Sequence, residues 1–324
     1  MNWFTFNLQD FSVSFLSILF EGVPFMFLGT LISGIVDAFV SPETMAKIQP
    51  RNPLAAIALS GALGVVFPMC ECGMVPVIRR MIRKGLPVSC ALTYLLAAPI
   101  VNPIVAISTF AAFKGQHPAM MMSLRIGMGF VVALVCGLVI HCLPHARILN
   151  REMLAPPPNR RPPLGARLSS QKPMGEDSPL EVFPEPAARK SFGGRMMGAA
   201  RCAAFDFLDV GFYLIIGAAI ASVFNTAVHR DAILSLAGNS VVATGSMMIL
   251  ALLLSLCSTS DAFIAASFVG FPMAAKLAFM VFGPMMDVKL LFMYGLVFRK
   301  RFTLPFALAL FLLIGVLCWG LGLH

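Results

Sequence analysis

Eight long stretches of predominantly apolar residues recur along this chain, and no other feature restricts its fold as strongly. A helix that crosses a bilayer needs about 20 such residues, and each stretch approaches or exceeds that length. The composition agrees, because 58% of the residues are hydrophobic and only 12% are charged. The sequence therefore predicts an all-α polytopic membrane protein. The stretches are residues 11–40, 53–69, 87–113, 119–143, 203–227, 241–257, 272–298 and 303–323.

One region between the apolar stretches has a different composition. Residues 145–201 are rich in proline and charge and show almost no apolar periodicity, which is typical of flexible linkers. We interpret this region as a basic, proline-rich cytoplasmic linker. It separates a first membrane half, residues 1–144, from a second membrane half, residues 202–324. A membrane scaffold that recruits partners through this linker is an alternative function.

The two halves carry the same features in the same order. Residues 20–36 align without gaps with residues 208–224, and matched cysteines, prolines and polar residues follow in each half. Helix-breaking residues at corresponding points of two repeats are typical of transporters that bind substrate near the bilayer midplane. The matched pairs are Glu21 with Asp209, Cys70 with Cys257, Pro99 with Pro284, and Asn102 with Asp287.

The distribution of positive charge favours one arrangement of these halves. If residues 53–84 and 241–270 form re-entrant hairpins, each half crosses the membrane about three times and the halves are inverted repeats. Basic residues collect on the cytoplasmic side of membranes, and this arrangement leaves only five of the 24 Lys and Arg residues elsewhere. Eight full transmembrane helices are the alternative. The five exceptions are Lys114, Arg125, Arg230, Lys276 and Lys289.

The tips of the two hairpins carry most of the candidate chemistry. Hairpin arms of roughly 12 to 15 residues reach only about the bilayer midplane, so the tips "CECG" and "CSTSD" should meet there. Cys70 and Cys72 offer soft sulfur ligands beside Glu71, and thiolates select ions such as Cu(I) and Zn. With Cys257 as a third sulfur, these cysteines are candidate ligands for a thiophilic solute or a metal ion. Simple packing of small side chains is the alternative.

Polar residues of the second tip and of two helix breaks are further candidates. Ser258, Ser260 and Asp261 are expected either to line the substrate path or to cap a helix. Asn102 in "APIVNP" and Asp287 in "FGPMMD" each follow a proline that frees a backbone carbonyl. We expect all five residues to contribute to the substrate site, and a packing kink is the alternative for the two breaks.

Charged residues within the apolar stretches suggest how transport is driven. Intramembrane carboxylates often relay protons, so Glu21 and Asp209 are predicted to couple transport to protons. Lys289, two residues beyond Asp287, is predicted to pair with an acid in the cavity, and a purely structural pair is the alternative. The basic cluster within residues 79–84 is interpreted as an anchor that reaches lipid headgroups, with an electrostatic funnel for an anionic substrate as the alternative.

Motifs of common enzyme classes are missing from the sequence. It contains no G-x-x-x-x-G-K-[ST] phosphate loop, no H-E-x-x-H helix and no C-x-x-C pair. We therefore predict a transporter without a cofactor rather than an enzyme. A thiol redox protein that uses Cys70 and Cys72, and a transporter of a small anion, are the alternatives. The net charge of +9 reflects membrane orientation rather than nucleic-acid binding.

Two elements together resemble a known family. "CECGMVP" and "AAPIVNP" match the C-x-C-G-x-x-P and A-P-x-x-N-P elements of the predicted permease family that includes the ArsP organoarsenical efflux permeases. The resemblance covers both halves and implies a multi-pass permease of the bacterial inner membrane, some relatives exporting trivalent arsenicals through cysteine contacts. It also implies a second small membrane subunit. A small-molecule or ion substrate, membrane lipids and a homo-oligomer complete the expected partners.

Overall fold

The computed structural model describes residues 8–41, 44–45, 49–50, 52–66, 69–144, 148–150, 192–227 and 240–321. The linker predicted at residues 145–201 therefore lies largely outside the described residues. Its end at residues 192–201 is helical, because helix α11 already begins at Phe192.

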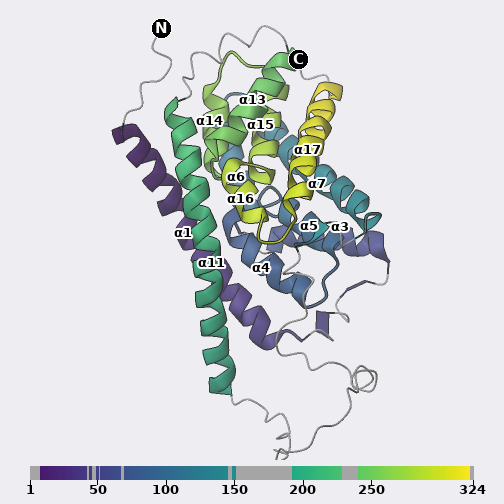
Figure 1. Ribbon diagram of the computed structural model, residues 1–324. Coiled ribbons are helices and arrows are strands. Elements are labelled where there is room, and N and C mark those ends of the chain that lie inside the picture. The colour runs from purple at the N-terminus through teal and green to yellow at the C-terminus, as the bar shows by residue number, and fades with distance from the viewer. Residues whose placement is uncertain are drawn as a thin grey trace, which may run out of the picture.

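Helices make up almost all of the described residues (Figure 1). Apart from one isolated bridge between Leu149 and Phe298, no strand pairing occurs in this part of the chain, which confirms the predicted all-α class. The first half contains α1 (Leu8–Phe39), α3 (Pro53–Val66), α4 (Glu71–Arg83), α5 (Val88–Ala97), α6 (Pro103–Ala112) and α7 (Pro118–His141). The second half contains α11 (Phe192–Ala227), α13 (Ser240–Leu254), α14 (Ser260–Ser267), α15 (Met273–Met285), α16 (Val288–Tyr294) and α17 (Lys300–Gly320).

Both halves follow one order of elements. A long helix comes first, two short helices form the segment predicted as a hairpin, two more short helices flank a proline break, and a long helix ends the half. The breaks fall where the sequence places them. α5 ends at Ala97, just before Pro99, and α15 ends at Met285, just after Pro284.

Helix length separates spanning elements from shorter ones. Five apolar segments of the described residues are long enough to cross a membrane: Leu8–Phe39, Pro118–His141, Met196–Thr226, Met273–Tyr294 and Arg301–Gly320. The fourth of them contains the break between α15 and α16. By contrast, α3 and α13 have 14 and 15 residues, so neither exceeds about 22 Å at 1.5 Å per residue. A hydrocarbon core of about 30 Å is too thick for either helix alone.

The first helices of the two halves form an antiparallel pair on one side of the molecule (Figure 1). Near one end Asn225 of α11 donates a hydrogen bond to Ser14 of α1, and near the other end Ser33 of α1 donates to Asp206 of α11. Residue numbers thus rise along one helix as they fall along the other.

Two glycines bring α4 into backbone contact with α1. A Cβ atom at Gly29 would lie only 2.2 Å from the carbonyl oxygen of Gly73, a separation that no real side chain adopts. Gly73 belongs to the "CECG" tip, so its missing side chain lets the start of α4 lie directly on α1. Small residues allow this close approach in membrane helix packing.

The core is centred on the two helices that precede the breaks. Every residue of α5 is buried, and so is every residue of α15 from Ala274 to Met285. Large apolar side chains on α1, α11 and α17 face outward, as expected for surfaces in contact with lipid tails. The breaks and tips are therefore enclosed by protein, where irregular backbone is tolerated within a membrane.

Candidate functional site

Residues from both tips and from α1 line one small cavity inside the bundle. The sequence predicted five members of this lining as site residues, although they are far apart in the chain. Lys289, which was predicted to pair with an acid in the cavity, also lines it, and the structure adds Ser255, which was not predicted. The ten lining residues are Ile18, Glu21, Gly22, Phe25, Cys70, Glu71, Cys72, Ser255, Cys257 and Lys289.

The first tip is shaped by the start of α4. Cys70 precedes the helix in an extended conformation, with φ −75° and ψ 164°, and its side chain makes no capping hydrogen bond. Glu71 and Cys72 occupy the first turn of α4 and are both buried. The two thiols and the carboxylate thus bracket a helix N-terminus beside the cavity.

An ion pair joins the first tip to the second half of the chain. Lys289 Nζ lies 3.0 Å from Oε1 of Glu71 and 3.4 Å from Oδ2 of Asp287. It also donates a hydrogen bond to the carbonyl oxygen of Ser255, at 3.2 Å. The other carboxylate oxygen of Glu71, Oε2, is buried without a hydrogen-bond partner. Buried polar atoms are normally paired, so this oxygen marks a place where a bound species would gain an interaction.

The second tip approaches the cavity through Cys257 and Ser260. Ser255 begins this tip in the left-handed backbone region, with φ 48°, a conformation that is uncommon for residues other than glycine and is often found at functional sites. The hydroxyl of Ser260 donates to Oε1 of Glu21 at 3.0 Å. Glu21, which is half-buried, therefore contacts the second tip as well as the cavity.

Asn102 and Asp287 are helix caps at the two breaks. Oδ1 of Asn102 accepts a hydrogen bond from the backbone nitrogen of Ile104 at 2.9 Å, and Oδ1 of Asp287 accepts one from that of Leu290 at 2.7 Å. Both residues satisfy free N–H groups at the start of α6 and α16. Only Asp287 adjoins the cavity, through its contact with Lys289, whereas Asn102 is not among the lining residues.

Asp261 forms an ion pair with Arg125 and does not line the cavity. Nη2 of Arg125 lies 2.9 Å from both carboxylate oxygens and 2.7 Å from the carbonyl oxygen of Ser258. Nη1 donates to Thr109 of α6 at 2.8 Å. Arg125 is only 1% exposed. It was predicted only as a cation away from the cytoplasm, and no sequence pattern connected it to the second tip.

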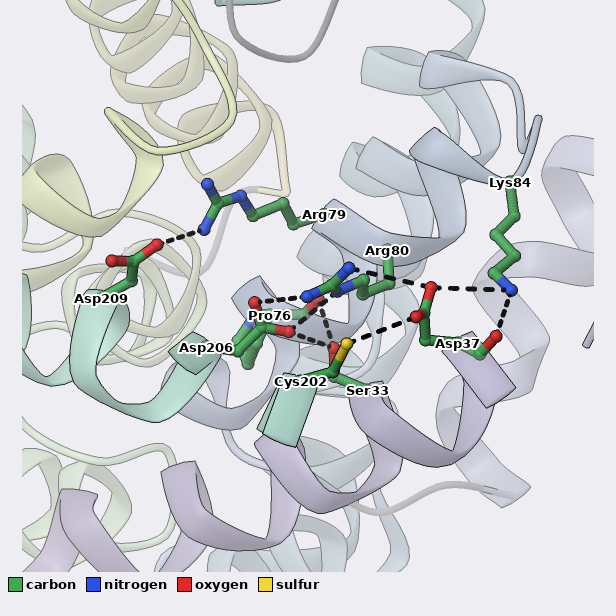
Figure 2. Close-up of polar contacts among 9 residues, drawn as sticks. All are labelled: Ser33, Asp37, Pro76, Arg79, Arg80, Lys84, Cys202, Asp206 and Asp209. Atoms are coloured by element: carbon green, nitrogen blue, oxygen red, sulfur yellow. Dashed lines mark hydrogen bonds and ion pairs between the residues drawn. The ribbon is translucent and has the colours of Figure 1, made fainter. Parts of the chain in front are cut away.

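Asp209 lies away from Glu21, its match in the repeat. Its carboxylate is 3.0 Å from Arg79 of α4, and its side chain is 57% exposed (Figure 2). Arg80 and Lys84 are likewise paired with acids of α1 and α11. The interpretation of the cluster within residues 79–84 as a lipid anchor is therefore wrong for these three cations, which bind protein carboxylates instead.

The cysteines of the described residues form no preformed metal centre. All eight are free thiols. No group of three or more His, Cys, Asp or Glu side chains in the described ranges is close enough to hold a metal ion. The metal site predicted from Cys70, Cys72 and Cys257 thus has no support in this conformation, although all three residues line the same cavity.

These features define a polytopic α-helical membrane protein in which residues of both halves line one small cavity. The chain belongs to the predicted permease family ArsP_1, which it matches over residues 7–321. The family expected from the "CECG" and "APIVNP" elements is confirmed. Membership identifies a membrane permease and indicates a transporter rather than an enzyme.

Two relatives match the chain over nearly its full length. The UPF0718 protein YcgR of Bacillus subtilis is 36% identical over 312 residues, which cover 95% of this chain and 94% of the relative. A protein of Streptococcus mutans named as a putative two-component membrane permease complex subunit is 32% identical over 309 residues, covering 95% and 93%. No solved structure matches the chain.

Proposed function

We propose that this permease is a secondary transporter that moves a small thiophilic solute, such as a trivalent arsenical or a soft metal species, across the bacterial inner membrane. The cavity lining carries the proposal, because Cys70 and Cys72 from one half and Cys257 from the other face the same space. Thiol groups select soft, electrophilic centres over hard ions. A site shared by two halves also suits alternating access, in which one half moves against the other.

The arrangement of the helices supports inverted halves with re-entrant hairpins. α1 and α11 occupy the same place in each repeat and run antiparallel, as inverted repeats require. The short helices α3 and α13 reach only part of the way through a bilayer. We propose that residues 53–84 and 241–270 enter and leave the membrane on the same side and bring their tips to the cavity.

The charged residues of the cavity have separate roles in this proposal. Glu21 couples transport to protons, because it lies in the cavity and is held by a single hydroxyl, that of Ser260. Glu71 presents its unpaired oxygen to an electrophilic solute. Lys289 is already neutralised by Glu71 and Asp287, so it offers little attraction to an anion. The lining thus favours a thiophilic solute over the small-anion alternative.

The remaining predicted residues are assigned to the walls of the site. Asn102 and Asp287 fix the two broken helices by capping them. Asp261 and the carbonyl group of Ser258 hold the second tip through Arg125. These contacts supply hydrogen-bond partners to irregular backbone beside the proposed solute path.

We also propose that the chain works with a second membrane subunit. The support is the name of the Streptococcus mutans relative, a putative subunit of a two-component membrane permease complex. Co-purification of the tagged chain from its native membrane tests this part of the proposal. Recovery of a single polypeptide species would contradict it.

Uptake by everted membrane vesicles tests the transport proposal. The panel contains Cu(I), Zn(II), a trivalent aromatic arsenical and several small anions. We expect flux of at least one thiophilic species, and we expect Cys70→Ser to abolish it because the variant loses a soft ligand of the cavity. Cys90→Ser is the matched control, since Cys90 is also buried but packs in a separate cluster with Ala56 and Ile57. Flux that is the same in both variants would overturn the thiol role.

A further inference from the structure

Six charged side chains connect the end of α4 to the α1–α11 pair (Figure 2). Three cations from one helix meet three carboxylates from two others, so the charges balance. These six residues are called the latch cluster below. Its ion pairs are Arg79 with Asp209, Arg80 with Asp206, and both Arg80 and Lys84 with Asp37.

The strongest contact of the latch cluster is the bidentate ion pair between Arg80 and Asp206. Nε of Arg80 lies 2.9 Å from Oδ2 of Asp206, and Nη2 lies 3.0 Å from Oδ1. Such parallel hydrogen bonds between a guanidinium and a carboxylate combine strength with fixed geometry. The hydroxyl of Ser33 donates to the same carboxylate at 2.8 Å. Asp206 is almost fully buried, so the pair is poorly screened by water.

Lys84 binds the end of α1 as well as a side chain. Its ammonium donates to the backbone carbonyl oxygens of Asp37 and Val40, which belong to the last turn of α1 and the residue just beyond it. A cation at a helix C-terminus satisfies free carbonyls and interacts favourably with the helix dipole. The latch cluster thus ties α4 to the backbone of α1 and to side chains of both long helices.

The latch cluster and the cavity occupy opposite ends of α4. Glu71 and Cys72 lie in its first turn beside the cavity, whereas Arg80 and Lys84 are at its other end. Between them, Gly73 contacts the backbone of α1 at Gly29. α4 is therefore held against α1 from the cavity to the basic side of the protein, which the positive-inside rule places in the cytoplasm.

In the second half, the described residues form no equivalent set of ion pairs between α14 and the long helices α1 and α11. α14 packs mainly against α6 and α15, and its contact with α11 is slight at most. Gly217, which aligns with Gly29, meets the backbone of Lys289 in α16 rather than α14. Asp261 is the only charged residue of α14, and it is paired with Arg125. The end of α4 is thus tied by several ion pairs to the α1–α11 pair, whereas the ion pair of α14 joins it to α7.

We propose that the latch cluster is the cytoplasmic gate of this permease and that the structure shows it closed. Opening would separate the three cations of α4 from Asp37, Asp206 and Asp209, and would carry the first tip away from α1. This inference rests on the proposed transport function. Because every cation of the latch cluster is paired with at least one of the three carboxylates, the gate would have two discrete arrangements, paired and separated, as a switching element requires.

The thiols of the first tip can report on the gate without knowledge of the substrate. Everted vesicles are treated with a membrane-impermeant maleimide, and labelling of each cysteine is read by peptide mass spectrometry. In Arg80→Gln we expect labelling of Cys70 and Cys72 from the cytoplasmic face to rise by roughly tenfold, because loss of a buried charged contact shifts the gate toward the open arrangement. The exposed Cys142 should be labelled equally in every variant.

Exchanging the charges of Arg80 and Asp206 distinguishes an effect on gating from general destabilisation of the fold. The double variant Arg80→Asp with Asp206→Arg restores an ion pair and should return tip labelling toward that of the unmodified protein. Arg301→Gln removes a cation from the same side of the membrane outside the latch cluster, and it should leave labelling unchanged. If Arg80→Gln does not accumulate in membranes, Lys84→Gln provides a milder opening variant with the same expected direction.

Two results would overturn the gate. One is unchanged labelling of Cys70 and Cys72 in folded Arg80→Gln and Lys84→Gln proteins. The other is increased labelling only in right-side-out vesicles, which would place the opening on the wrong face. Failure of the transport proposal can be distinguished from failure of the gate proposal. It would appear as an absence of cysteine-dependent flux, whatever the result of the labelling experiment.

Discussion

Lys289 of α16 places its ammonium 3.0 Å from the carboxylate of Glu71 in α4, and this contact joins the two halves of the chain at the cavity. A second contact mirrors it, since Arg125 of the first half binds Asp261 at the second tip. Each tip is thus held by a cation from the opposite half. Any movement of one half against the other must stretch or exchange these ion pairs.

Loss of the Lys289 ammonium should strongly destabilise the protein. In Lys289→Met the side chain keeps its approximate length, but Glu71 and Asp287 become buried carboxylates without a cation. Breaking a buried ion pair in this way costs about 3–5 kcal/mol. We therefore expect the melting temperature of the detergent-solubilised protein to fall by many degrees, measured by intrinsic fluorescence during heating.

The double variant Lys289→Met with Glu71→Gln should recover part of this loss, because the amide no longer requires a counterion. Asp287 would still lack its partner, so recovery should be incomplete. A double variant no more stable than Lys289→Met alone would show that Glu71 is not the energetically important partner.

Arg125→Lys should not behave as a conservative change. Arg125 binds Thr109 with one terminal nitrogen and binds Asp261 and the Ser258 carbonyl with the other. A lysine ammonium cannot reproduce this planar fork, and lost hydrogen bonds to charged groups cost about 1.5–3 kcal/mol each. We expect a reduced melting temperature and greater maleimide labelling of Cys257 at the second tip. Unchanged values for both would contradict a positioning role for Arg125.

The sequence was sufficient to locate the breaks, whereas the re-entrant hairpin tips stay a prediction. Proline at residues 99 and 284 interrupts hydrogen bonding within a helix, so the ends of α5 and α15 are local properties of the chain. The C-x-C element likewise places two thiols around Glu71 at a helix start. Repetition of these features in both halves then indicated which segments should meet.

Long-range pairing could not be predicted in the same way. Glu71 and Lys289 are 218 residues apart, and the sequence predicted an acid partner for Lys289 without identifying Glu71 as that partner. The alignment of Glu21 with Asp209 predicted proton coupling for both acids, with a partly interfacial position as the alternative for Asp209. Their surroundings differ because α1 packs on α4, whereas α11 packs on α16. Asp209 lies where α11 also contacts the end of α4, so it meets Arg79 at the latch cluster and not the cavity.

Gly29→Ala tests the close approach of α1 and α4. The added methyl group would lie 2.2 Å from a backbone oxygen of Gly73, so the helices must separate. Overpacking of this kind costs about 1–3 kcal/mol. Gly127→Ala is the matched control in α7, where nothing lies within 4 Å of the new methyl group. Heating experiments should show a lower melting temperature for Gly29→Ala only; equal effects in both variants would rule out the backbone contact.

Glu21→Gln should separate proton coupling from folding. The carboxylate of Glu21 accepts a hydrogen bond from Ser260, and an amide oxygen can accept the same bond. The melting temperature should therefore change little. Because glutamine cannot bind and release a proton, solute flux in everted vesicles should no longer respond to an imposed pH gradient, while flux down the solute's own gradient persists. A Glu21→Gln protein whose flux still follows the pH gradient would exclude Glu21 as the coupling residue, and Ser260→Ala, which keeps the carboxylate, should retain the response.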